Sequence, residues 1–378
     1  MPRVGKANNK CKAKINKVDF TDERITGRGG VSLFSRYLEN SGILLVMTSF
    51  FGCLRKSRKG LPIAELFKQI LCFFMEGSSR SLVHFDRLAA DKAYAGAIQT
   101  KPEFMASSHT IKRFMKSFSF AFIWSFRRIL LNLFIGRLKK QQPEVITLGI
   151  DLVILNNSDA QQREGVEFTY KNINGFGVSS MIWNNLIIDA SLRSGDKHSN
   201  HGKSVHRMVR RVVERIRAEY RHVPILLRLD SGYMDQELFN LFEELGVKYT
   251  CSGKMYNDIS SFLMNLRGRS WQRHYGKGSV EDSRIWEYTE FGDRRGTWDK
   301  FRRCICYRPM CDELGQPYLP CTIYCQAIYT NFGIGDETDV QLKEAGYNFQ
   351  DFPEAIIDFH HGRGNDFHPP SQIFNQKN

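Results

Sequence analysis

Two aspartates stand at the ends of apolar segments, where a charged side chain is unexpected. Asp151 lies in the run from Val145 to Leu155, and Asp230 follows the run that begins at Pro224. A carboxylate in so apolar a setting is costly unless a partner compensates its charge, and a divalent cation shared by two carboxylates is such a partner. Each aspartate also fits a local role, in bonds to nearby amides or in an Asp-Ser-Gly turn. Taken together they predict a site for a divalent metal ion.

The positive charge of the chain is concentrated in its first part. The 378 residues include 54 Lys and Arg against 40 Asp and Glu, a net charge of +14, and residues 1–150 alone hold 26 basic and 10 acidic side chains. This asymmetry predicts a basic DNA-binding half joined to a metal-binding half. Two carboxylate-bound ions next to DNA are suited to phosphodiester chemistry, because one activates a water or 3′-hydroxyl and the other stabilises the leaving oxygen.

From residue 144 onward the hydrophobic pattern alternates between strands and helices. Strands are predicted over 145–155, 177–183 and 186–192, the last two as a hairpin. A helix over 200–220, a strand over 224–229, a helix over 235–245 and a strand over 247–252 follow. This is the order of the ribonuclease H-like α/β fold, in which the first strand lies beside the strand after the first helix. That arrangement would bring Asp151 and Asp230 together.

Residues 31–143 have a helical pattern and are the predicted DNA-binding domain, preceded by a basic disordered tail over residues 1–30. Within it, the segment 107–116 has the character of a recognition helix, with Lys112, Arg113 and Lys116 on its flanks. A basic amphipathic helix packed through Phe114 and Phe118 explains the same pattern. Both interpretations leave the three basic side chains on the surface.

The last part of the chain adds a β-rich segment and a final helix. Short stretches rich in Trp, Tyr, Arg and Gly predict a β-rich insertion at about 268–330, within a catalytic domain that covers residues 144–378. Residues 322–331 are predicted to return to the core as a strand. A helix is expected to start near Phe352, with Pro353 in its first turn.

Four motifs occur in a characteristic order along the chain: Gly149-Ile-Asp151, the region from Gln161 to Gly177, Leu229-Asp230-Ser-Gly-Tyr233 and Ile328-Tyr-Thr-Asn331. Together they resemble the DDE transposases of bacterial insertion sequences, in the branch whose ribonuclease H-like core carries a β-rich insertion. The resemblance extends from about Gly29 to Asp366. It implies that Asp151 and Asp230 are the first two metal ligands of an acidic triad.

The same resemblance places the third ligand, a Glu, in a Tyr-x2-Arg-x3-Glu-x6-Lys signature of the final helix. Here Arg363 matches the Arg, but His360, Phe367 and Phe374 hold the positions of the Tyr, the Glu and the Lys. Asp366 points about 100° away from the Glu position on a helix, and Glu354 and Asp358 come too early. Pro369 and Pro370 would end a helix. We therefore expect the third acid to be missing through truncation or a frameshift, which would impair this chain.

Other clusters have more than one interpretation. Five cysteines at 304, 306, 311, 321 and 325 could suggest zinc, but alternating strand positions explain them as well. His198 and His201 open a basic helix and could meet phosphate or cap the helix. Trp271, Trp286 and Trp298 fit either base stacking or β-core packing. The basic residues of the helix are expected to contact DNA or to form a solvated face: Lys203, Arg207, Arg210, Arg211, Arg215 and Arg217.

The resemblance implies a cut-and-paste DNA transposase that binds terminal inverted repeats and target DNA, acts as a homodimer on paired ends and uses Mg²⁺. Lys112, Arg113, Lys116, Lys203, Arg207, Arg210 and Arg363 are its expected DNA contacts. A polar N-terminus without an apolar core region, and apolar stretches too short or too interrupted to span a bilayer, predict a cytoplasmic, nucleoid-associated bacterial protein. A non-catalytic DNA-binding remnant or regulator is the alternative, and a metal-dependent nuclease without strand transfer is a third possibility.

Overall fold

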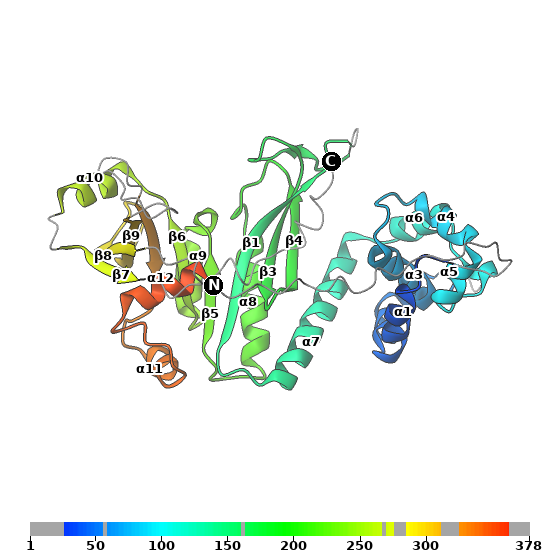
Figure 1. Ribbon diagram of the computed structural model, residues 1–378, viewed down its shortest axis with the longest axis horizontal. Helices are drawn as coiled ribbons and strands as arrows, with labels where there is room; N and C mark the ends of the chain where they lie inside the picture. The colour runs from blue at the N-terminus through cyan, green and yellow to red at the C-terminus, as the bar shows by residue number, and fades with distance from the viewer. Residues whose placement is uncertain are drawn as a thin grey trace, which may run out of the picture. The chain divides into compact units, whose positions relative to one another are not determined.

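The computed structural model describes residues 26–55, 59–159, 163–266, 270–275, 285–310 and 325–362. The chain divides into two compact units, Met1–Ser125 and Phe126–Asn378 (Figure 1). The division precedes the change of pattern at residue 143. Helix α7 (Ile123–Gln141) accounts for the difference, because Leu131, Phe134 and Leu138 are buried in the core of the second unit. Helical periodicity alone does not show which core a helix packs against.

The first unit is helical in all its described segments. Its elements are α1 (Val31–Asn40), α2 (Ile43–Phe51), η1 (Gly52–Leu54), α3 (Ile63–Glu76), α4 (His84–Ala90), α5 (Lys92–Ala97), η2 (Pro102–Phe104), α6 (Ser108–Lys116) and η3 (Phe120–Phe122). No single described helix of the chain is long and apolar enough to cross a membrane, although two bent helix pairs satisfy that test on length and composition.

Phenylalanine rings hold the first unit together. The ring of Phe67 in α3 lies 5.2 Å from Phe51 and 5.4 Å from Phe114, and Phe114 lies 5.1 Å from Phe118. Aromatic pairs at these separations add to the burial of their apolar surface. Because Phe114 belongs to α6, this cluster fixes one face of α6 and leaves the opposite face to solvent.

The second unit is built on one mixed sheet. Its strands are β1 (Ile146–Asn156), β2 (Glu167–Phe168), β3 (Asn174–Trp183), β4 (Leu186–Ser194), β5 (Ile225–Leu229), β6 (Lys248–Gly253), β7 (Gln272–Tyr275), β8 (Ile285–Asp293), β9 (Arg302–Pro309) and β10 (Gln326–Thr330). The helices are α8 (Ser204–Arg217), η4 (Ser231–Tyr233), α9 (Gln236–Glu244), α10 (Asn257–Asn265), α11 (Glu337–Glu344) and α12 (Pro353–His361).

The strand order confirms the predicted fold. β4 pairs with β3 and β3 with β1, both antiparallel, whereas β1, β5 and β6 are parallel neighbours. The hairpin between β3 and β4 turns at Asn184 and Asn185, which both have positive φ, as a two-residue turn of this kind requires. Three antiparallel strands followed by two parallel ones in the order β4-β3-β1-β5-β6 are the core of a ribonuclease H-like α/β fold.

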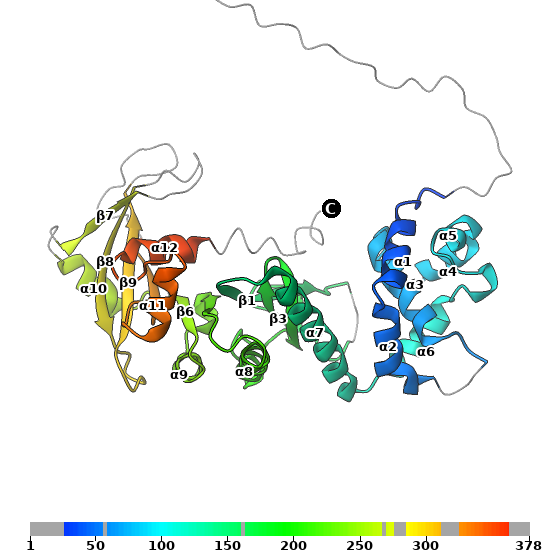
Figure 2. The same cartoon turned by 90° about the horizontal axis from the view of Figure 1, so that it is seen from below.

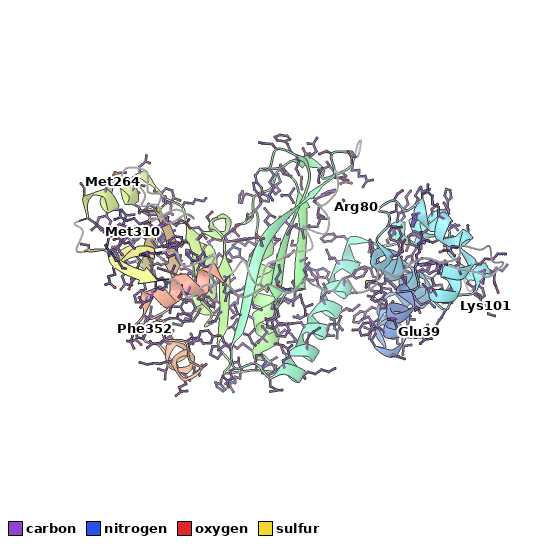
Figure 3. The ribbon with its side chains drawn as sticks, in the orientation of Figure 1. Glu39, Arg80, Lys101, Met264, Met310 and Phe352 are labelled. Carbon is purple, nitrogen blue, oxygen red and sulfur yellow. The ribbon has the colours of Figure 1, made fainter. Side chains whose placement is uncertain are left out.

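The β-rich segment continues this sheet. β10 pairs antiparallel with β6, and β9, β8 and β7 follow outward. The strand predicted to return to the core is therefore confirmed. Helix α10 before β7 was not predicted; it buries Ile259 and Leu263 and leaves the next side chain, Met264, 84% exposed (Figure 3).

Helices cover both faces of the sheet. The buried residues of α7, α8 and α9 belong to one cluster with Leu148 and Ile150 of β1 and Leu229 of β5. Those of α11 and α12 belong to a second cluster with Leu226 of β5 and Ile328 of β10. Figure 2 shows α8 and α9 on one side of the strands and α12 on the other. Below, the two sides are called the α8 face and the α12 face.

Candidate metal site and nucleic-acid contacts

Asp151 and Asp230 occupy neighbouring positions on the two central parallel strands. Ile150 of β1 pairs with Leu229 of β5, so that the next positions in register are Asp151 and Asp230. Asp230 is still extended, with φ −87° and ψ 175°. Neighbouring strands lie about 5 Å apart. The two half-buried carboxylates are thus carried by adjacent strand ends, as the predicted strand order requires.

Both side chains point to the α12 face. Along β5, Ile225, Leu227 and Leu229 belong to the core under α8, whereas Leu226 packs with α12. Side chains alternate between the faces of a strand, which places Asp230 on the side of Leu226 and Arg228. Along β1 the same alternation, with Ile150 in the α8 core, puts Asp151 on that side as well. Two carboxylates therefore share one face of the sheet.

The Asp-Ser-Gly-Tyr turn shapes the end of β5. The Gly232 amide donates to Asp230 Oδ1 at 2.9 Å, and the Tyr233 hydroxyl donates to Ser179 Oγ of β3 at 3.3 Å. Tyr233 is fully buried. A β-carbon added at Gly232 would lie 2.5 Å from Ser199 Oγ and 3.1 Å from Asp230 Oδ1. A larger residue here would have to displace the Ser199 side chain, which comes from the loop before α8.

Two tyrosines experience the charge of both carboxylates. Burial raises the pKa of Tyr233, and the negative charges of Asp230 and Asp151 raise it further. Partial burial and the same two carboxylates also raise the pKa of Tyr170, which follows β2. Both phenols therefore remain neutral at ordinary pH. Both aspartates thus act on the same two phenols, as expected of carboxylates carried by adjacent strand ends.

Helix α12 is anchored on the face that carries the aspartates. The imidazole of His360 lies 2.9 Å from Ser252 Oγ and 3.0 Å from Thr250 Oγ1, two hydroxyls of β6. Beside it, the Arg228 guanidinium lies 4.1 Å from the ring centroid of Phe359. The residue at the Tyr position of the expected signature thus holds the end of the helix on the sheet. No pattern in the sequence indicates the two hydroxyls that contact His360.

The described residues do not provide a third acid. Glu354 accepts a hydrogen bond from the Tyr288 hydroxyl at 3.0 Å, and Asp358 lies 2.8 Å from His274 Nε2. Both early carboxylates are therefore engaged with the β-rich segment. Within the described ranges, no group of three His, Cys, Asp or Glu side chains could hold a metal ion. Arg363, Asp366 and Phe367 lie outside the described residues.

The basic residues of α6 are on the surface. Lys112, Arg113 and Lys116 are exposed, whereas Ile111 and Phe114 are buried. Ser107 caps the helix by accepting from the Thr110 amide at 3.3 Å. The carboxylate of Asp86 accepts from the amide and hydroxyl of Ser108, at 2.8 and 2.7 Å. Since Asp86 occupies these donors, the helix start is less suited to phosphate than the exposed basic face.

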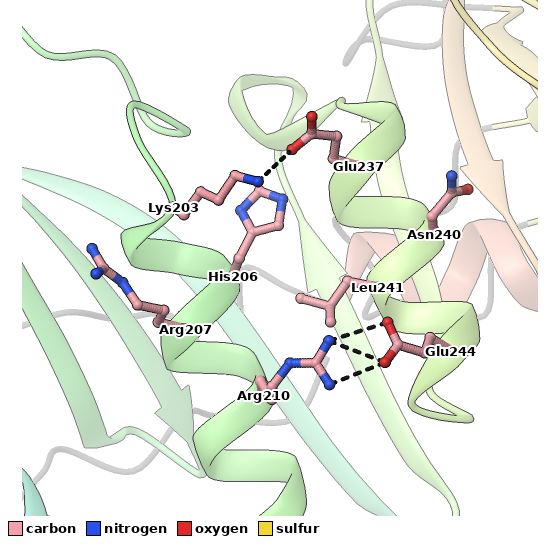
Figure 4. A pocket seen from close by; sticks show the side chains of 8 residues that line it. All are labelled: Lys203, His206, Arg207, Arg210, Glu237, Asn240, Leu241 and Glu244. Atoms are coloured by element: carbon pink, nitrogen blue, oxygen red, sulfur yellow. Dashed lines mark hydrogen bonds and ion pairs between the residues drawn. The ribbon is translucent and has the colours of Figure 1, made fainter.

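The basic residues of α8 differ in their environments. A groove of about 440 Å³ lies between α8 and α9. Figure 4 shows Lys203, His206, Arg207 and Arg210 on one wall of it. Arg210 is bidentate to Glu244 at 3.0–3.1 Å, and Lys203 lies 3.7 Å from Glu237. Arg207 is exposed and has no carboxylate within ion-pair distance in the part of the chain that the structure describes. Lys203 and Arg207 therefore keep more of their charge available than Arg210.

The other basic side chains of α8 have structural partners. Arg211 pairs with Asp189, Arg215 lies 2.9 Å from Glu219, and Arg217 donates to backbone carbonyls that include Gly246 O at 3.3 Å. The Arg215–Glu219 pair is partly exposed and contributes little to stability, whereas the Asp189 carboxylate that pairs with Arg211 is buried. These contacts compensate much of the positive charge of α8. The free positive charge of the helix is therefore smaller than its basic composition predicts.

The cysteine and tryptophan clusters are largely explained by packing. Cys304 and Cys306 are buried at alternate positions of β9 with sulfurs 3.9 Å apart, while Cys311 and Cys321 lie outside the described residues. Trp271 and Trp298 are 9% and 8% exposed and belong to the main core. Trp286 is partly buried against the α12 core. These rings serve the β-core packing rather than an open stacking surface.

Comparison with known proteins identifies the family. The model of the transposase DDE domain, group 1, matches residues 8–323. The chain belongs to this family. No curated protein sequence matches the chain. The acidic strand ends described above therefore belong to a DDE transposase domain, and the family predicted from the four ordered motifs is confirmed.

Solved transposase structures are also similar to this DDE transposase chain. One is the piggyBac transposase synaptic complex with hairpin DNA, at 12% identity and TM-score 0.32, covering 92% of this chain and 66% of that one. Another is a pre-cleavage Mos1 transpososome, at 10% identity and TM-score 0.20, covering 60% and 78%. The chain spans slightly less than two thirds of the piggyBac protein. The fold assignment rests on the strand order given above.

Proposed function

We propose that this chain is a DNA transposase that binds terminal inverted repeats and carries out metal-dependent strand cleavage and transfer by a cut-and-paste route. The observation that carries the proposal is the placement of Asp151 and Asp230 at adjacent positions of two parallel strands, on one face of a ribonuclease H-like sheet. Membership of the DDE family supports it. Each carboxylate accepts a hydrogen bond from a nearby backbone amide. These local bonds do not explain why the two carboxylates are placed side by side.

Asp151 and Asp230 are the proposed ligands of Mg²⁺, or of Mn²⁺ in its place. Carboxylate oxygens are the donors these ions prefer, so that the donor set fits. When bound, such an ion would activate a water or a 3′-hydroxyl and stabilise the leaving oxygen of a phosphodiester. The protein contributes the fixed direction of both carboxylates: the sheet register sets the first, and the Gly232 amide and the buried Tyr233 anchor set the second.

Double-stranded DNA is the proposed partner, as terminal repeats and as target. Lys112, Arg113 and Lys116 of α6 present a basic face suited to phosphates, and Lys203 and Arg207 offer a second basic surface. Arg210 and Arg363 complete the proposed contacts, although Glu244 compensates the charge of Arg210. A homodimer on paired ends and a nucleoid-associated bacterial location complete the proposal.

The proposal includes impaired activity. Phe367 stands where the family signature has its catalytic Glu. With only two acids, metal would bind more weakly and the transition-state charge would be less well compensated. The alternative function is a non-catalytic transposase remnant that binds DNA and occupies element ends. Glu354 is bonded to Tyr288, and Asp358 is bonded to His274. These contacts argue against either carboxylate as a replacement for the missing ligand.

The test is cleavage of duplex DNA that carries the ends flanking the gene, in Mg²⁺ and in Mn²⁺. Asp151→Asn and Asp230→Asn should each lower cleavage by roughly 100-fold or more while DNA binding persists. Asp235→Asn is the matched control, because Asp235 caps α9 in the same region and Asn is an equally good cap. The remnant would be favoured if the chain binds DNA in a salt-sensitive way but shows no cleavage that either substitution abolishes. Cleavage without joined strands on a gel would indicate a nuclease.

A further inference from the structure

The loop between β4 and α8 carries the Gly195-Asp-Lys-His-Ser-Asn-His-Gly-Lys203 motif, to which the proposed function assigns no role beyond its last residue. The side chain of Arg193 forms hydrogen bonds to this loop and to the start of α8. Arg193, near the end of β4, is 8% exposed and donates through Nη1 to the carbonyls of His198, at 2.9 Å, and Ser199. Its Nη2 donates to Ser204 Oγ at 2.7 Å, in the first turn of α8. A single guanidinium thus ties both ends of the segment 198–204.

The same loop lies against the turn that presents Asp230. The Ser199 side chain approaches Gly232 so closely that a β-carbon there would lie 2.5 Å from its Oγ and 3.0 Å from its Cβ. Gly232 in turn donates its amide to Asp230. A continuous series of contacts therefore runs from Arg193 through Ser199 and Gly232 to the Asp230 carboxylate.

A buried arginine is a costly way to hold a loop. In the part of the chain that the structure describes, no carboxylate lies within 4.0 Å of the Arg193 guanidinium. Burial lowers the pKa of Arg193, and the nearby Tyr233 acts in the opposite direction. The charge is offset instead by carbonyl and hydroxyl dipoles, and charge-assisted hydrogen bonds are roughly twice as strong as neutral ones. Such bonds give the loop a defined position that an apolar residue would not provide.

We propose that Arg193 is a positioning residue for the metal site: it holds Ser199 against Gly232 and thereby fixes the direction of the Asp230 carboxylate. The inference rests on the proposed function, since it concerns the same pair of aspartates. Arg193 forms no ion pair with either aspartate, and its hydrogen bonds go to the loop and to the first turn of α8. Groups that orient a metal ligand from behind typically change metal affinity or activity about 10- to 100-fold.

The experiment is a titration of the full chain with Mn²⁺ alone, followed by electron paramagnetic resonance. Arg193→Met should weaken binding at the Asp230-dependent site by about 10-fold or more, and Arg193→Lys should recover part of the affinity. Arg127→Met is the matched control. Arg127 is a partly buried arginine whose Nη2 donates to the Ala190 carbonyl at 2.7 Å and whose Nε lies 3.3 Å from the Asp189 carboxylate, two partners on β4 that lie outside the loop. It should lower thermal stability and leave Mn²⁺ affinity within about twofold.

The outcomes separate the two proposals. If the unsubstituted chain shows no Mn²⁺ binding that Asp230→Asn removes, the proposed function fails. If the unsubstituted chain does bind Mn²⁺ in a way that Asp230→Asn removes, the comparison of the two arginine variants is decisive. Equal Mn²⁺ affinity of folded Arg193→Met and Arg127→Met would then overturn the positioning role. Should Arg193→Met fail to fold, Ser199→Gly removes the contact with Gly232 alone and should weaken Mn²⁺ binding about threefold. Unchanged affinity in Ser199→Gly would then refute the role.

Discussion

The guanidinium of Arg228 lies 4.1 Å from the ring centroid of Phe359, which joins β5 to the last turn of α12. Arg228 is two residues before Asp230 and on the same face of the strand. A cation above an aromatic ring is held by the ring's negative face. The contact therefore secures the end of α12 next to the proposed metal site, on the face where a third acidic ligand of a DDE domain is expected.

A first prediction concerns this third ligand. Phe367→Glu places a carboxylate at the Glu position of the signature and should raise Mg²⁺-dependent cleavage by roughly 100-fold, because a further ligand adds several kcal/mol of charge stabilisation. Phe367→Gln has the same size without the charge and should remain at the starting level. The measurement is single-turnover cleavage of labelled duplex ends. Equal rates for the two variants would count against an impaired triad.

A second prediction tests how tightly the Asp230 turn is packed. Gly232→Ala should weaken Mn²⁺ binding about tenfold, because the new methyl group would meet Ser199 and the Asp230 carboxylate. Adding Ser199→Gly removes the closest obstacle, so that the double variant should bind better than Gly232→Ala alone. Such non-additivity is expected of residues in contact. Simply additive losses in a Mn²⁺ titration would contradict the packing.

Gly96→Ala is the matched control for this pair. Gly96 lies inside α5, its φ is not positive, and a β-carbon there meets no atom within 4 Å. Alanine is the better helix former by about 0.5–1 kcal/mol. The variant should therefore be as stable as the original chain or slightly more stable, with unchanged Mn²⁺ binding. A loss there would mean that any added methyl group disturbs the chain.

The sequence was a good guide wherever local pattern decides the structure. The strand predicted over 145–155 is Ile146–Asn156, and the helix predicted over 235–245 is Gln236–Glu244. Apolar alternation and capping residues determine both. The adjacency of Asp151 and Asp230 was also accessible, because the order of strands and helices fixes which parallel strands are neighbours.

Contacts between segments that are distant in the sequence could not be predicted. Nothing near Arg193 in the sequence indicates that its guanidinium reaches the carbonyls of residues 198 and 199, and the hydroxyls that receive His360 lie 108 and 110 residues away. The free charge of α8 was overestimated for the same reason, since Glu244 and Asp189, which pair with Arg210 and Arg211, come from other elements. Composition counts charges but does not show their partners.

A third prediction concerns a buried ion pair that fixes the chain after β10. Lys248 and Asp339 have side chains 2% and 3% exposed and lie 3.0 Å apart, and Lys248 also lies 3.0 Å from the Asn331 carbonyl. Lys248→Met leaves the Asp339 charge buried without its cation and should lower the free energy of unfolding by about 3–5 kcal/mol. Urea denaturation followed by tryptophan fluorescence measures this loss.

Lys343→Met is the control for the ion pair. Lys343 lies 3.0 Å from Asp351, but their side chains are 58% and 51% exposed, so that water screens the interaction. Its loss should change the free energy of unfolding by no more than about 1 kcal/mol. If the two variants were equally stable, Lys248 would not hold the segment after β10 in place.

The last prediction is a pH dependence that arises in the groove between α8 and α9. Burial lowers the pKa of His206 below 6.5; the nearby Asp235 and Glu237 oppose this shift, and Lys203 adds to it. Neither ring nitrogen has a hydrogen-bond partner in the structure. The folded chain therefore binds a proton on this ring less readily than the unfolded chain. Its contribution to stability is present above pH 6.5 and is lost as the pH falls through the lower, folded pKa.

His206→Gln removes the titrating group, so that its melting temperature should fall less than that of the original chain between about pH 7.5 and pH 5.5. The exposed His222→Gln is the control for the loss of a histidine as such, and it should keep the full decrease. Differential scanning calorimetry at the two pH values gives the comparison directly. An identical decrease in the His206→Gln and His222→Gln variants would show that the acid sensitivity comes from groups outside this groove.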